Sequence, residues 1–102
     1  MKAIIVQTTT NNIKEAKKIA KILLEKNLAA CIHISAVDSL YTWNSEFCEE
    51  VEYLLNIKTK KENFKKIKSK IKELHSYDVP EIVSFKIDDL SKDYEKFIEE
   101  NC

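Results

Sequence analysis

The chain alternates between stretches whose apolar residues recur every second position and stretches whose apolar residues recur every third or fourth position. Residues 3–7 are apolar and rich in isoleucine and valine, which predicts a strand. Asn12 and Glu15 match a capping box, and the apolar residues that follow keep helical spacing. We therefore expect a helix over residues 13–26, with Asn27 near its C-terminal end.

The middle of the chain predicts a long β-hairpin. Residues 28–43 begin with strict alternation of apolar and polar positions, after which the apolar parity slips. A bend or bulge near residues 36–38 would explain the slip. The turn is expected at residues 44–46, and residues 47–59 return as a strand whose apolar residues share one face.

A second helix and a last strand are predicted after the hairpin. Thr59 and Glu62 match another capping box, and an apolar stripe at helical spacing follows over residues 64–74. Residues 75–80 end this helix and contain the single proline. Residues 81–87 then form the last strand.

The C-terminal residues predict a short third helix. Ser91 is expected to cap it, and its apolar side chains, which we expect to be buried, are Tyr94, Phe97 and Ile98. The order of elements predicts one α+β domain over residues 1–102. We expect a ferredoxin-like βαββαβ sandwich with its helices on one face of an antiparallel sheet, an extra C-terminal helix, and a long hairpin between the second and third strands.

Composition narrows the class of protein. The 102 residues contain no glycine, and the 17 basic residues, all lysines, balance 17 acidic residues. Without arginine the chain lacks the bidentate fork that recognises guanine and phosphate, so we expect no nucleic-acid partner. It also lacks a glycine-rich phosphate loop, and no nucleophile–base spacing suggests an enzyme.

The distribution of apolar residues and cysteines bears on location. No apolar run reaches the length of a membrane span or of a signal-peptide core, so we expect no membrane partner. Cys31, Cys48 and Cys102 are too few and too widely spaced for a disulfide framework or a paired zinc knuckle. Reduced thiols and a cytoplasmic location are the expectation.

The predicted hairpin is too long for a domain of this size. A strand of ~14 residues spans ~45 Å, whereas a compact domain of about 100 residues is roughly 35 Å across. The hairpin must therefore bend over its own sheet or project from it. A projecting tip would expose the apolar side chains of Leu40, Tyr41, Trp43 and Phe47, which favours self-association through the hairpin.

Three side chains are candidate metal ligands. Cys31 and His33 lie two positions apart on one strand, so both leave the same face and could supply two ligands. The alternative is a small buried thiol beside a surface imidazole. His75 follows the second helix, where it either interacts with the helix dipole or acts as a ligand or proton donor beside Tyr77 and Glu81.

Two clusters of charge also need an interpretation. Glu50 and Glu52, which follow directly after Glu49, leave one face of a strand and could share acid–base work or bind a hard cation. A solvated strand edge is the alternative. Eight lysines over residues 58–72 indicate the solvent-exposed face of an amphipathic helix, or else a surface that binds an anion or a nucleic acid.

Four sequence blocks, in order and at near-constant spacing, resemble the CutA family of divalent-ion tolerance proteins. They are residues 28–31 (LAAC), residues 40–43 (LYTW), the run from Glu50-x-Glu52 to residues 57–59 (IKT), and residues 75–82 (HSYDVPEI). The resemblance covers nearly the whole chain. It implies a ferredoxin-like homotrimer joined through sheet edges, a role in tolerance to copper and other divalent ions, an architecture like that of the PII signalling proteins, and no established catalytic activity.

The resemblance also implies where a site would lie. A copper site proposed for the family uses a cysteine at the position of Thr8 and two histidines at Leu74 and His75, of which only His75 is present here. With Cys31 and His33 as added candidates, we expect weak binding of Cu²⁺ or another divalent metal. The residues that we expect at an intersubunit cleft are Tyr41, Trp43, Glu50, Glu52, Lys58, Tyr77, Pro80 and Glu81.

This chain departs from the family pattern at four further positions. The family usually has proline at Asn11 and Ser76, glycine at Ser45 and asparagine at His33. Because a two-residue hairpin turn prefers a residue that tolerates positive φ, the change at Ser45 favours a wider turn with Asn44 in the left-handed conformation.

The leading functional hypothesis is a non-enzymatic homotrimer of the divalent-metal response. The alternative is a PII-like module that binds a small anionic ligand at intersubunit clefts. An enzyme that uses His75, Tyr77 and the glutamates comes third.

Overall fold

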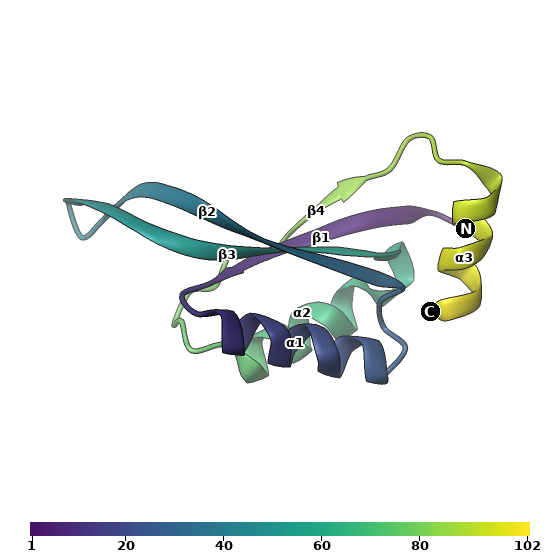
Figure 1. Ribbon diagram of the computed structural model, residues 1–102, viewed down its shortest axis with the longest axis horizontal. Coiled ribbons are helices and arrows are strands. Elements are labelled where there is room, and N and C mark those ends of the chain that lie inside the picture. The colour runs from purple at the N-terminus through teal and green to yellow at the C-terminus, as the bar shows by residue number, and fades with distance from the viewer.

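The computed structural model describes residues 1–102 as four strands and three α-helices (Figure 1). In chain order the elements are β1 (Ala3–Thr10), α1 (Ile13–Glu25), β2 (Cys31–Trp43), β3 (Glu46–Lys60), a 3₁₀ turn η1 (Lys61–Asn63), α2 (Phe64–Leu74), β4 (Val83–Lys86) and α3 (Lys92–Asn101).

The four strands form one antiparallel sheet in the order β2-β3-β1-β4. In Figure 1, α1 and α2 lie together below one face of the sheet, and α3 stands beyond the end of the sheet where β1 begins. The expected α+β, ferredoxin-like βαββαβ architecture is confirmed. The third helix is an addition at the sheet end and not part of the helical layer.

The ends of α1 follow from its sequence. The Asn12 side chain accepts a hydrogen bond from the Glu15 backbone N–H at 2.8 Å, as the capping pattern predicts. At the other end Asn27 has φ 56°, and the N–H groups of Asn27 and Leu28 reach back to the carbonyls of Leu24 and Leu23. This is a Schellman ending, in which asparagine takes the position that glycine usually occupies.

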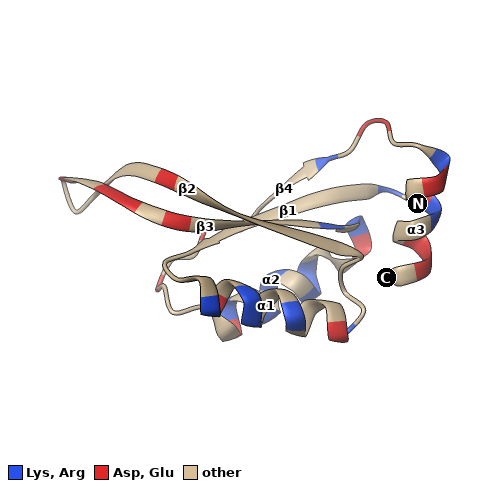
Figure 2. Cartoon of the chain, viewed as in Figure 1, with Lys and Arg blue, Asp and Glu red and all other residues tan.

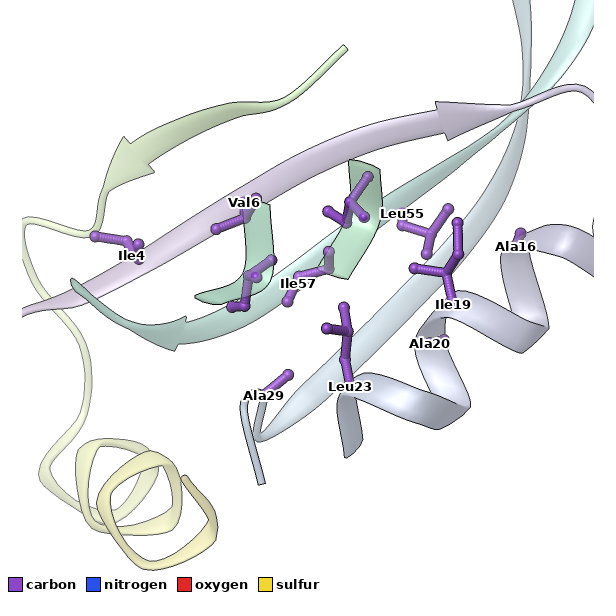
Figure 3. Packing of buried hydrophobic residues seen from close by; sticks show 11 residues of the cluster. Ile4, Val6, Ala16, Ile19, Ala20, Leu23, Ala29, Leu55 and Ile57 are labelled. Atoms are coloured by element: carbon purple, nitrogen blue, oxygen red, sulfur yellow. The ribbon is translucent and has the colours of Figure 1, made fainter. Parts of the chain in front are cut away.

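The core lies between the sheet and the two helices (Figure 3). Alternate residues of β1 and β3 point into it, because successive side chains of a strand leave opposite faces. They meet the apolar stripes of α1 and α2, whose helical spacing the sequence predicts. The buried cluster consists of Ile4, Val6, Ala16, Ile19, Ala20, Leu23, Ala29, Leu55, Ile57, Ile67 and Ile71.

The hairpin of β2 and β3 projects from the domain and does not fold back over the sheet (Figure 1). It accounts for the 45 Å length of the molecule, against 25 and 21 Å in the other two directions. The register runs without interruption from the pair Cys31–Lys58 to the pair Trp43–Glu46. The bulge expected near residues 36–38 is therefore absent.

The slip in apolar parity has a different cause. Beyond the helices neither face of the hairpin is covered, so apolar residues occur on both faces. Leu40 and Phe47 remain 60% and 69% exposed, and Trp43 is 54% exposed. The alternation rule applies only where one face meets a core, and the distal hairpin lies outside that region.

The hairpin turn is tighter than expected. Trp43 pairs with Glu46, so only Asn44 and Ser45 form the loop, with φ values of 51° and 64°. Two central residues at positive φ match a type I′ turn, whose twist fits that of the strands. Asn44 is left-handed as expected, but Ser45 is left-handed too, and the turn is not widened.

The expected cap of the second helix is also wrong. Thr59 is still part of β3, paired with Ile4, and its fully buried hydroxyl donates to the Leu28 carbonyl at 2.6 Å. The helix α2 begins five residues later, after η1, and no side chain caps it. Satisfying a buried carbonyl in the core takes precedence over capping, because an unpaired carbonyl there would be costly.

The last two elements differ in extent from their predictions. The strand β4 covers only Val83–Lys86. In α3 the Ser91 side chain accepts from the Tyr94 backbone N–H, as expected, and Ile98 is buried. Tyr94 is only half-buried, however, and Phe97 is 39% exposed, because the helix meets the end of the sheet and not a full face.

Charge is unevenly distributed over the fold. Figure 2 shows lysines along α1 and α2 and acidic residues along the projecting part of the hairpin. None of the helices combines the length and apolar character needed to cross a membrane.

Replacing Ser45 by glycine should stabilise the hairpin. A non-glycine residue in the left-handed region carries a steric cost of roughly 1–2 kcal/mol, and the greater chain entropy of glycine offsets part of the gain. We expect the free energy of unfolding to rise by about 0.5–1 kcal/mol, measured by urea denaturation at fixed protein concentration.

The matched control is Ser35→Gly, which lies in the extended part of β2. It should lower stability by about 0.5–1 kcal/mol, because there glycine brings only the entropic cost. A loss of stability in both variants would contradict the proposed role of φ at Ser45.

Candidate functional site

A cleft of about 620 Å³ lies between the projecting part of the hairpin and the segment that joins α2 to β4. Six of its twelve lining residues belong to the set expected from the sequence: Tyr41, Trp43, Glu50, Glu52, Tyr77 and Glu81. The volume falls in the range typical of small-molecule sites. It is the larger of the two hollows described here.

Two tyrosine–glutamate pairs shape one wall of the cleft. The Tyr41 hydroxyl donates to Glu50 Oε1 at 2.5 Å, and the Tyr77 hydroxyl donates to Glu52 Oε2 at 2.6 Å. Tyr41, Glu50 and Glu52 share one face of the hairpin, since Tyr41 pairs with Cys48 and carboxylates two and four residues further along β3 point the same way. Each carboxylate is therefore held in one orientation by a phenol.

The cleft is electronegative. Hydrogen bonding to Glu50 raises the pKa of Tyr41 to about 12, because ionising this phenol would place two negative charges side by side. Burial, together with the hydrogen bond to Glu52, raises the pKa of Tyr77 well above its usual range. Glu52 itself is only 7% exposed, and neither Glu50 nor Glu52 takes part in an ion pair.

His75 holds the segment that brings Tyr77 to the cleft. Its imidazole is fully buried, Nε2 donates to the Thr9 carbonyl at 2.6 Å, and Nδ1 accepts from the Tyr77 backbone N–H at 3.1 Å. Its ring also lies 4.7 Å from the ring of Tyr77. Both ring nitrogens are thus hydrogen-bonded to backbone groups. This histidine therefore positions the loop that carries Tyr77.

Cys31 and His33 do lie together, at the opposite end of the hairpin. Cys31 Sγ is 3.7 Å from His33 Nε2, and Lys58 Nζ is 2.9 Å from His33 Nδ1. An ammonium can only donate, so the His33 lone pair on Nδ1 is taken by Lys58. Tyr94 neighbours Cys31. Its pKa is raised, mainly by burial and to a smaller extent by the charge of Cys31.

The three candidate metal ligands do not converge. Cys31 pairs with Lys58 and Lys58 with Ile5, whereas His75 contacts Thr9, which is four residues further along β1 and about 13 Å away at 3.3 Å per residue. No group of three or more His, Cys, Asp or Glu side chains could hold a metal ion.

The residues at the positions where the resemblance implies a copper site do not fit a metal either. Thr8 is fully buried with its hydroxyl unpaired, Leu74 has no donor atom, and both nitrogens of His75 are engaged. A hard or borderline cation needs several free lone pairs at one point.

Lys58 and Pro80, which were also expected at a cleft, are not among the lining residues. Lys58 is instead bonded to His33 at the open end of the hairpin, where Lys58 pairs with Cys31.

The lining residues that sequence reasoning missed are Thr9, Asp38, Ser39, Leu40, Asp78 and Val79. Ser39 could have been found by register, because it pairs with Glu50. Asp78 and Val79 lie inside the recognised segment of residues 75–82.

Comparisons with known proteins agree with this architecture. The family model for the CutA1 divalent ion tolerance protein matches residues 4–101. The divalent-cation tolerance protein CutA of Thermus thermophilus is 40% identical over 98 residues, which cover 95% of each chain. The chain belongs to the CutA family. The corresponding protein of Pyrococcus horikoshii is 37% identical over 95 residues and 93% of each chain.

Solved CutA structures show the same fold. The periplasmic divalent cation tolerance protein CutA from Archaeoglobus fulgidus superposes with a TM-score of 0.95 at 32% identity, over 97% of each chain. CutA1 from Oryza sativa gives a TM-score of 0.95 at 28% identity, over 99% of this chain and 94% of its own. The names of these CutA proteins describe tolerance to divalent cations and no reaction.

Replacing Glu50 by glutamine should bring the pKa of Tyr41 down from about 12 towards its ordinary value, because the carboxylate charge that opposes phenolate formation is removed. Phenolate absorbance across alkaline pH measures the change. Subtracting the titration of the Tyr41→Phe protein isolates this tyrosine from the other three.

Glu49→Gln is the control for the same measurement. It removes the same charge from the adjacent residue, whose side chain leaves the opposite face of β3. We expect little effect from it. Equal shifts in the two variants would show that general charge, and not the Tyr41–Glu50 contact, sets this pKa.

Proposed function

We propose that this CutA protein is a non-enzymatic homotrimer that takes part in the response to divalent metal ions, copper among them. The observation that carries the proposal is the uncovered apolar surface of the projecting hairpin. A monomeric soluble protein rarely leaves such a patch exposed. The exposed residues are Leu40, Trp43, Phe47 and Val51, each more than half exposed.

The sheet also has edges that a neighbour could pair with. The strands β2 and β4 are the outer strands, so each leaves one row of backbone N–H and C=O groups unpaired. Pairing the edge of one subunit with a different edge of the next gives a head-to-tail contact, which closes into a ring if the rotation fits. A ring of three is what the family resemblance leads us to expect.

The metal role rests on family membership and on the ligand chemistry of Cys31 and His33. These two side chains already lie 3.7 Å apart, and one supplies sulfur and the other nitrogen. A metal there would have to displace Lys58 from His33, and it would have only two protein ligands from one chain. We therefore propose weak binding, completed by water or by a neighbouring subunit.

The alternative of a PII-like module that binds an anion finds little support at the cleft. Five of the lining residues are acidic, namely Asp38, Glu50, Glu52, Asp78 and Glu81, and none is basic. Anions would be repelled there. The lysine-lined hollow between the residues that follow α1 and the helix α2, with Lys26, Lys65, Lys66 and Lys70, has the appropriate charge for an anion.

We place the protein in the cytoplasm. Its three cysteines are all free, which suits a reducing compartment. The relative from Archaeoglobus fulgidus carries the description periplasmic.

Light scattering should return about three times the chain mass of 11.9 kDa, and Trp43→Ala should shift the equilibrium towards smaller species. An aromatic side chain buried at a subunit contact contributes about 2 kcal/mol or more to association. Helix content, measured by circular dichroism, should be unchanged, because Trp43 ends β2 at the tip of the hairpin, which projects away from α1 and α2 (Figure 1).

Phe97→Ala is the control for the same measurement. Phe97 is also a partly exposed aromatic residue, but it lies on α3 at the far end of the molecule. It should leave the mass unchanged. A wild-type mass equal to one chain would overturn the trimer, and a fully stable Trp43→Ala trimer would remove Trp43 from the contact.

Titration with Cu²⁺ by calorimetry tests the metal role, and Zn²⁺ provides a check without redox chemistry. Affinity should fall as pH decreases, because histidine binds metal only when neutral. His33→Asn should lower the affinity for the metal by about tenfold, because the loss of one favourable contact typically weakens binding by that factor.

His75→Asn is the second arm of that titration. If His75 only positions the loop, this variant should bind metal as the wild type does. A larger loss in His75→Asn than in His33→Asn would place the metal at the end of α2. No binding by any of the proteins would overturn the direct metal role.

A further inference from the structure

The charge of the cleft is not compensated within the chain. Glu52 is nine-tenths buried, yet its only hydrogen-bond partner is the Tyr77 hydroxyl, which binds Oε2. No lysine or histidine lies within ion-pairing distance of Glu50 or Glu52. A buried carboxylate without a cation is costly, so this site has a place for positive charge that the chain itself does not fill.

The size and the walls of the cleft indicate an organic cation. A volume of about 620 Å³ far exceeds the space that a single ion and a few waters occupy. Metal ions need several ligands converging at one point, and the acidic side chains here do not converge in that way. The walls include Tyr41, Trp43 and Tyr77, whose rings attract cations and pack against methylene groups.

The hydrogen bonds of the two glutamates favour an ammonium group over a guanidinium group. Tyr41 already occupies Oε1 of Glu50, and Tyr77 already occupies Oε2 of Glu52. A guanidinium fork prefers both oxygens of one carboxylate, whereas an ammonium needs only one oxygen from each. One oxygen per carboxylate is what the tyrosines leave free.

The spacing of the carboxylates favours more than one ammonium group. Glu50 and Glu52 are two residues apart on β3, so their side chains are about 7 Å apart along the strand. A short methylene chain spans that distance. Asp78 and Glu81 face them from the segment between α2 and β4 and extend the negative surface across the cleft.

We propose that this cleft binds an aliphatic di- or polyamine, with ammonium groups at Glu50 and Glu52 and the methylene chain against Trp43 and Tyr77. This function is separate from the metal role and requires no metal ligand. The residues of the metal proposal, Cys31 and His33, lie at the other end of the hairpin.

Calorimetric titration of the assembled protein with putrescine and with spermidine tests the proposal. We expect saturable binding at one site per chain, and weaker binding as salt rises because charges are screened. Butylamine, with one ammonium, should bind at least about tenfold more weakly than putrescine, since one charge-assisted contact is lost. Agmatine, in which a guanidinium replaces one ammonium, should also bind more weakly.

Three variants locate the site. Glu52→Gln should weaken putrescine about tenfold or more by removing the buried charge while keeping the shape. Glu50→Gln gives the same test at an exposed position, where folding is not at risk. Glu49→Gln, on the opposite face of β3, is the matched control and should bind within about twofold of the wild type.

Several results would overturn the proposal. These are no saturable amine binding at millimolar concentrations, equal losses in Glu49→Gln and Glu52→Gln, or agmatine binding as tightly as putrescine. Displacement of putrescine by micromolar Mg²⁺ that depends on Glu52 would make the cleft a metal site instead. Cu²⁺ binding that depends on His33 leaves these amine measurements unaffected, so the two functions can fail separately.

Discussion

The length difference between strands and helices governs this structure. The helices α1 and α2 have 13 and 11 residues and span at most about 20 Å at 1.5 Å per residue. The strands β2 and β3 have 13 and 15 residues and reach about 43–50 Å at 3.3 Å per residue. The helices can therefore cover only about half of the hairpin, and the rest has no core of its own to pack against.

The half of the hairpin that the helices leave uncovered forms a cleft with one loop, the segment between α2 and β4. The buried imidazole of His75 ties the end of α2 to the end of β1 through the Thr9 carbonyl. That contact leaves Tyr77 within hydrogen-bond distance of Glu52. A chain of hydrogen bonds thus runs from the core to the cleft. Since each group in it is buried or half-buried, the chain fixes the carboxylate more firmly than an exposed contact could.

The parts of the fold that depend on local chemistry could be predicted from the sequence, and the parts that depend on long-range contacts could not. Asn12 and Asn27 mark the ends of α1 because their side-chain and backbone preferences act over a few residues. Thr59 has the same local pattern as a cap, but its place in β3 directs it to the Leu28 carbonyl. Similarly, the Tyr77–Glu52 contact joins residues 25 positions apart, which no local pattern encodes. The cleft residues that were anticipated came from the family resemblance.

Assembly and the chemistry of the cleft are linked through Trp43. This residue lines the cleft and is also more than half exposed in a single chain. A neighbouring subunit that covers the indole would remove water from the mouth of the cleft at the same time. Electrostatic attraction between a carboxylate and a cation is stronger where water is excluded, because the local dielectric constant is lower. Covering Trp43 would therefore bury apolar surface and strengthen the hold of Glu50 and Glu52 on a bound cation. By linkage, a cation that binds only the assembled form would in turn stabilise the assembly.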